Sequence, residues 1–171
     1  MSKRGRQYVG LLSAIMAYYI IHEGAHFIYS LLVGTFKKIN IMGLGVQIDI
    51  YREKMSDTQL AIFCLVGSVA TLIVGYILVL QIERICKISS KVCKACMYYI
   101  TIALLLLDPL YLSLLCSFFG GGDMNGISLV CGELIIRSVY GGILILNLIL
   151  FAKVVLPKYR ISFEKEILIL K

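Results

Sequence analysis

Long apolar stretches separated by short polar segments dominate the chain. Four of them, at residues 8–33, 59–82, 97–119 and 126–152, are long enough to cross a bilayer, because a membrane helix needs about 20 predominantly apolar residues. A segment surrounded by lipid can satisfy its own backbone polar groups only as a helix. The pattern therefore predicts an all-α, polytopic membrane protein, with about four transmembrane helices forming one membrane domain over residues 1–171.

The segment after the first apolar stretch has a different period. Between Lys38 and Ile50 apolar residues alternate with small or polar ones, and Gly43 and Gly45 lie near the middle. This alternation is typical of strands, so we expect a short β-hairpin after the first helix.

The tail after Pro157 alternates charged and apolar residues, which predicts either a strand or an interfacial helix.

The composition agrees with a membrane location. Of the 171 residues, 60% are hydrophobic and only 16% are charged, whereas about 25% are charged in a typical soluble domain. With so few charges, a soluble fold would expose large apolar patches to water. A soluble globular protein and a disordered chain are both excluded.

The net charge of +7 is carried mainly between the apolar runs. This placement indicates contact with the surface of the lipid bilayer, and we expect no nucleic-acid partner. With four helices, both termini and the second loop share one side, which carries 12 basic residues against 4 on the other. The positive-inside rule then predicts that both termini are cytoplasmic. The 12 residues are Lys3, Arg4, Arg6, Arg84, Lys87, Lys91, Lys94, Lys153, Lys158, Arg160, Lys165 and Lys171.

The first apolar stretch contains the motif His22-Glu23-Gly24-Ala25-His26, an HExxH sequence that uses the only two histidines of the chain. On a helix, positions i and i+4 share one face, so both imidazoles can reach one metal ion. Zinc suits such ligands, and it needs a third protein ligand. Glu23 is placed to act as a general base on water. Ionisable groups inside a membrane helix are costly and usually functional.

The third ligand must come from a later segment. Asp108, within the third stretch, and Asp123, in the glycine-rich turn before the fourth, are equally good candidates from the residues alone. Glu133 is better explained by an ion pair with Arg137 at i+4, and Asp49 is a more remote candidate. Cys86, Cys93 and Cys96 offer three sulfurs with no histidine left to join them, so we expect free thiols rather than a second metal site.

HEGAH in a membrane helix resembles the zinc site of the site-2 protease family of intramembrane metalloproteases. The resemblance implies that Asp123, in Gly122-Asp123-Met124-Asn125-Gly126, corresponds to the aspartate of the family's Leu-Asp-Gly motif and completes the zinc site. Residues 66–70 are a loose counterpart of the family's small-residue patch, and the predicted hairpin is similar to the one that follows HExxH. The implied protein is a small member without a PDZ-like insertion, in a bacterial or archaeal cell membrane.

Two departures from the family pattern stand out. The Asn-x-x-Pro sequence that usually precedes the ligand aspartate is missing, and Asp108-Pro109 stands nearest to its place. Cytoplasmic termini would also put the zinc in the outer half of the membrane, whereas the family usually holds it toward the cytoplasm.

The hypothesis is an intramembrane zinc metalloprotease. His22, His26 and Asp123 would hold Zn²⁺, Glu23 would be catalytic, and the substrate would be a membrane protein or peptide cut in or next to a membrane segment. Two alternatives remain open at this stage: a catalytically silent homologue that acts as a membrane binding partner, and a metal-handling membrane protein.

Overall fold

The computed structural model describes residues 1–42, 45–119 and 122–169. Its chain order is α1 (Lys3–Leu32), β1 (Phe36–Met42), β2 (Gly45–Ile50), η1 (Arg52–Lys54), α2 (Asp57–Leu80), α3 (Ile82–Cys86), α4 (Lys91–Leu110), η2 (Tyr111–Leu115), α5 (Cys116–Phe119), α6 (Gly122–Ile127), α7 (Glu133–Leu150), η3 (Phe151–Val155) and α8 (Leu156–Ile169). Four helical stretches within the described ranges are long and apolar enough to cross a membrane. The prediction of an all-α membrane protein with a short hairpin is therefore confirmed.

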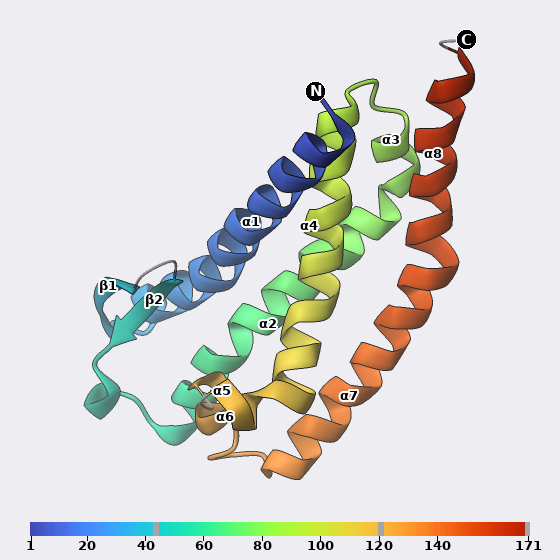
Figure 1. Cartoon of the computed structure of the whole chain (residues 1–171). Helices are drawn as coiled ribbons and strands as arrows, with labels where there is room; N and C mark the ends of the chain where they lie inside the picture. The colour runs from blue at the N-terminus through green and yellow to red at the C-terminus, as the bar shows by residue number, and fades with distance from the viewer. Residues whose placement is uncertain (43–44, 120–121, 170–171) are drawn as a thin grey trace.

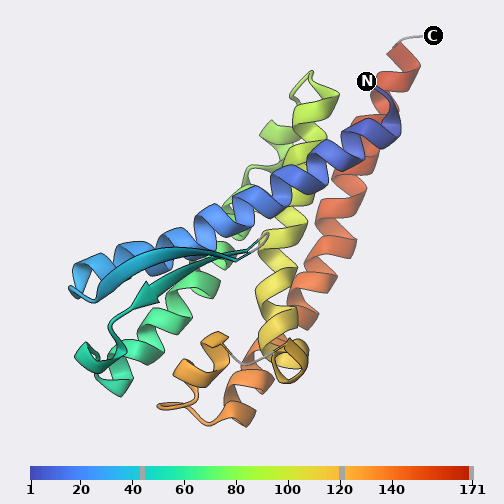
Figure 2. The same ribbon diagram turned by 60° about the vertical axis from the view of Figure 1, so that its left-hand side comes forward.

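The other three spans surround α4, which packs against α1, α2 and α7. Both views show the N-terminus and the last turns of α8 at one end of the bundle and α5 and α6 at the other, with the hairpin beside the C-terminal half of α1 (Figures 1 and 2). Large apolar side chains such as Leu12, Ile20 and Leu146 are exposed along the outside, whereas His22, Asp108 and Asn147 are buried. Apolar groups outside and polar groups inside are the arrangement that a hydrocarbon solvent favours.

The helix ends follow local capping rather than hydropathy. The Ser2, Ser56 and Ser90 side chains each accept a hydrogen bond from a backbone N–H in the first turn of α1, α2 and α4, respectively. The spans consequently begin at Lys3, Asp57 and Lys91, earlier than the predicted 8, 59 and 97. At the other end of α1, Gly34 adopts φ +68°, a conformation that suits glycine, and turns the chain into β1.

Among the four predicted membrane spans, the fourth differs most from the structure. Its predicted range, 126–152, is wrong at both ends, because the span runs from Glu133 to Glu164. Residues 128–131 are apolar in part but form a turn, which hydropathy does not register. At the other end, the π-helical turn η3 ends at Val155, and the helix continues as α8 through Pro157. The tail is therefore a helix continuous with α7 as far as Ile169, neither a strand nor a separate interfacial helix.

The hairpin agrees with the prediction, with antiparallel pairing from Phe36↔Ile50 to Met42↔Gly45 and an irregularity near Lys38. Gly43, at its predicted turn, lies outside the described residues, as do Gly120 and Gly121 of the glycine-rich segment.

Candidate metal centre

The two histidines of the motif lie on the face of α1 that points into the bundle. Both are buried, and their Nε2 atoms are 3.1 Å apart. The i, i+4 spacing places the two rings one above the other, with centroids 4.8 Å apart.

Asp123 reaches the histidines from the first turn of α6. Its Oδ2 lies 3.2 Å from His22 Nε2, and its Oδ1 lies 3.8 Å from His26 Nε2. Met124 and Ile127, buried in the apolar core, anchor α6. Gly126 lets α6 approach α2 closely, because a Cβ atom at this position would lie 2.2 Å from Cys64 Sγ. Together these contacts place the Asp123 carboxylate at the two imidazoles.

The other ring nitrogen of each histidine has an acceptor as its partner. His26 Nδ1 lies 2.6 Å from the carbonyl oxygen of Phe63, and His22 Nδ1 lies 3.3 Å from the carboxylate of Asp108. Each Nδ1 must donate its proton in these contacts, so a neutral imidazole presents the lone pair of Nε2. Two nitrogen lone pairs and a carboxylate therefore converge on one point. Such a point attracts a cation or a proton.

Asp123 brings negative charge to this point. Burial alone would raise the pKa of its carboxyl group, but hydrogen bonds from the two imidazoles, when a proton rather than a metal ion lies between these groups, outweigh burial and lower this pKa to about 2.

Asp108 is 1% exposed and lies behind His22 rather than beside Nε2. Tyr18 donates a hydrogen bond to it over 2.5 Å, and Thr71 donates a second one. The two aspartates that the sequence left as equal candidates thus contact opposite nitrogens of one ring. The remaining candidates lie elsewhere: Glu133 forms the expected ion pair with Arg137, and Asp49 pairs with Lys37.

The ligand set fits a small divalent metal. Atoms bound about 2.0–2.1 Å from a tetrahedral zinc ion lie about 3.3 Å apart. The two Nε2 atoms, 3.1 Å apart, and the pair His22 Nε2 and Asp123 Oδ2, 3.2 Å apart, are close to this value, whereas His26 Nε2 lies 3.8 Å from the other carboxylate oxygen, Oδ1. Gly67 of α2 keeps this space open. A Cβ atom at Gly67 would lie 2.6 Å from His26 Nε2 and 2.8 Å from His22 Nε2.

Glu23 lies at the wall of a cavity of about 420 Å³ that His22, His26 and Asp123 also line. The backbone N–H of Ile48 in β2 donates a hydrogen bond to Glu23 Oε2 over 3.2 Å. The hairpin thus holds the carboxylate of the motif beside the candidate metal position.

Sequence reasoning named Asp108 but missed three other groups that contact the histidines or Asp108. Tyr18 stacks on the His22 ring, with centroids 5.2 Å apart, and it precedes His22 by four positions, a spacing that could have revealed it. Thr71 is a polar residue in an otherwise apolar stretch, which is a weaker signal. The Phe63 carbonyl carries no sequence signal at all, since every residue has a carbonyl group.

Comparison of the chain with protein-family models, curated proteins and solved structures gives no match. The function is therefore inferred from the residues of the site.

Proposed function

We propose that the protein is an intramembrane zinc metalloprotease that resembles the site-2 protease family. The observation that carries the proposal is the convergence of His22 Nε2, His26 Nε2 and the Asp123 carboxylate within 4.8 Å of one another. HExxH supplies two of these groups together with Glu23, and a glutamate beside the metal is what peptide hydrolysis requires.

His22, His26 and Asp123 would hold the metal, and each has a support that fixes its position. Asp108 and the Phe63 carbonyl orient the two imidazoles through their Nδ1 protons. Bound zinc would supply Lewis acidity, polarising a carbonyl and making hydroxide accessible at neutral pH.

Glu23 would act first as the general base and then as the general acid of the reaction. Its carboxylate takes a proton from the attacking water and then gives that proton to the amine nitrogen as the C–N bond of the peptide breaks. One water is consumed, and a new carboxyl group and a new amine are formed. The hydrogen bond from Ile48 N–H keeps the carboxylate turned toward the cavity during both transfers.

The substrate would be a membrane-embedded or membrane-adjacent peptide, locally unwound where it is cut. The site cavity is bounded by α1 on one side and by Gly45–Ile48 of the hairpin on the other. A second, mostly apolar cavity of about 250 Å³ adjoins it, and Glu23 also lines this cavity. An extended apolar peptide is the kind of ligand that suits these walls.

The first experiment measures zinc per chain in detergent-purified protein. We expect about one zinc in the wild type and in Glu23→Gln, and none in Asp123→Ala. Asp108→Asn should still bind zinc at saturation, but about 10- to 100-fold more weakly, because it removes an orienting contact rather than a ligand. No zinc in the wild type, or loss of zinc from Asp108→Asn alone, would contradict this ligand set.

The second experiment measures cleavage. Wild type and Glu23→Gln are incubated with detergent-solubilised membrane proteins, and new peptide N-termini are identified by mass spectrometry. Glu23→Gln should reduce their formation by about 10²- to 10⁴-fold, whereas the exposed control Glu53→Gln should not. Zinc binding without cleavage would favour the silent homologue, and zinc transport into vesicles that depends on His22 would favour the metal-handling protein.

A further inference from the structure

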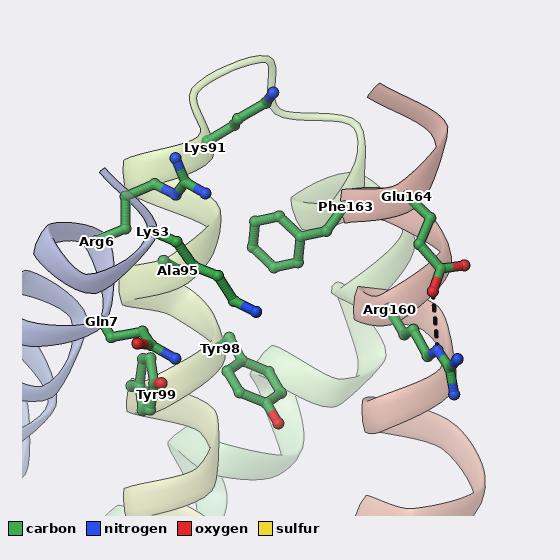
Figure 3. Close-up of a pocket in the computed structure, with 10 residues that line it drawn as sticks. All are labelled: Lys3, Arg6, Gln7, Lys91, Ala95, Tyr98, Tyr99, Arg160, Phe163 and Glu164. Carbon is green, nitrogen blue, oxygen red and sulfur yellow. Dashed lines mark hydrogen bonds and ion pairs between the residues drawn. The ribbon is translucent and has the colours of Figure 1, made fainter. Parts of the chain in front are cut away.

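A second cavity, of about 390 Å³, lies at the end of the bundle that holds both termini, far along α1 and α4 from the metal centre. Three helices line it (Figure 3). The lining residues are Lys3, Arg6 and Gln7 of α1; Lys91, Ala95, Tyr98 and Tyr99 of α4; and Arg160, Phe163 and Glu164 of α8.

The charged residues of this cavity are mostly basic. Four carry a positive charge and one carries a negative charge, and the single carboxylate, Glu164, is already paired with Arg160 at 2.9 Å. Lys3 and Arg6 have no carboxylate partner within 4.0 Å in the described part of the chain. Figure 3 shows the Lys3 ammonium extending into the space between α4 and α8. The cavity therefore favours an anion.

The walls between these charges are apolar. Tyr98 and Phe163 face each other across the cavity from α4 and α8, and Ala95 lies at the back of it (Figure 3). A ligand that pairs with the basic residues and also contacts the apolar walls combines an anionic group with an apolar portion.

The position along the bundle points to the same ligand class. Lys3 is the first residue of α1 and Lys91 the first of α4, so the basic residues lie where these spans leave the hydrocarbon layer. Phosphate headgroups lie at this level, and basic pockets between membrane helices suit them.

We propose that this cavity is a binding site for an anionic phospholipid. Its phosphate contacts Lys3 and Arg6, and its glycerol and upper acyl carbons lie between Tyr98 and Phe163. A lipid held there bridges the first and the last helix of the chain, which makes it a structural ligand separate from the metal centre.

The test exploits the absence of tryptophan from the sequence. Phe163→Trp introduces a single tryptophan in the cavity wall, which is excited selectively over the tyrosines. Its quenching by brominated phosphatidylglycerol is compared with quenching by brominated phosphatidylcholine in mixed vesicles. In this background the variant Lys3→Gln/Arg6→Gln is matched with Arg4→Gln/Arg84→Gln, which removes two exposed basic residues at the same end but outside the cavity.

We expect phosphatidylglycerol to be preferred, and the preference to fall about fivefold for each cavity cation removed. The control pair should change it less than about twofold. Native mass spectrometry repeats the comparison in chains that keep Phe163. It measures the binding of the two lipids to the wild type and to each of the two double variants.

Three outcomes would overturn the proposal. Equal quenching by the two lipids would show that no headgroup is selected. An equal loss in the two double variants would show general surface attraction rather than a site. Reversal of quenching by millimolar inorganic phosphate would show that free phosphate, and not a lipid, is the ligand.

Discussion

At the residue scale, the empty space beside Gly67 matters as much to the metal centre as its ligands do. Gly67→Ala would place a methyl group 2.6–2.8 Å from the two Nε2 atoms. Overpacking of this kind costs about 1–3 kcal/mol. If the imidazoles move to relieve it, zinc affinity falls by about 5- to 150-fold. Competition with a chromophoric chelator measures this affinity in detergent.

Gly24, inside the HExxH motif, offers the matched control. A Cβ atom there meets nothing within 4 Å, and alanine is the better helix former by about 1 kcal/mol. Gly24→Ala should therefore leave zinc affinity unchanged. If the two alanine variants bind zinc equally well, Gly67 does not shape the metal site.

Local spacing predicts only part of the candidate site, and among the later aspartates it was the resemblance to site-2 proteases that selected Asp123. The helical period alone brings His22 and His26 together, as the structure shows. Choosing between Asp108 and Asp123 requires knowing which nitrogen of His22 each one faces, and this depends on how α4 and α6 pack against α1. That packing is a tertiary property without a local signature.

At the element scale, Pro109 leaves a gap in the hydrogen bonding of α4. Proline has no N–H, so the carbonyl of Leu105, four residues earlier, lacks its helical donor. Asn147 of α7 fills the gap, because its Nδ2 donates to Leu105 O over 2.7 Å while its Oδ1 accepts from the Tyr76 hydroxyl at 2.8 Å. One buried amide thus joins α2, α4 and α7.

Asn147→Leu should lower the free energy of unfolding by about 1–3 kcal/mol, because it leaves a buried carbonyl unsatisfied. In the Pro109→Ala background the residue-109 N–H can bond to Leu105 O, so the same substitution should cost less. Thermal unfolding followed by circular dichroism gives both values. An equal cost in the two backgrounds would contradict the pairing of Asn147 with the proline gap.

The elements themselves were largely predictable, because four apolar stretches and one alternating segment correspond to four spans and a hairpin. The predicted helix bounds differ from the structure where local chemistry overrides hydropathy. Serine caps extend helices into polar sequence, and the fourth span continues through Pro157, which lies within α8.

At the scale of the whole molecule, the structure gives the two ends of the bundle different chemistry. The N-terminus, the last turns of α8 and the cavity lined by Lys3 and Arg6 lie at one end. α5 and α6 lie at the other, and the hairpin lies beside the C-terminal half of α1 (Figure 1). The positive-inside rule predicts that the end with the termini is cytoplasmic. The metal centre, nearer the hairpin end, would then open toward the outer side of the membrane.

Two exposed cysteines allow a direct measurement of this orientation. Cys93 lies in the first turn of α4, at the end with the termini, and Cys131 lies just before α7, at the other end. A membrane-impermeant maleimide added to intact cells should label the wild type and Cys93→Ser, but not Cys131→Ser. Permeabilised cells should add labelling of Cys93, which shows that it is reactive when reached. Loss of labelling in Cys93→Ser instead would place the termini outside and the metal centre in the cytoplasmic half, the arrangement that the resemblance to site-2 proteases implies.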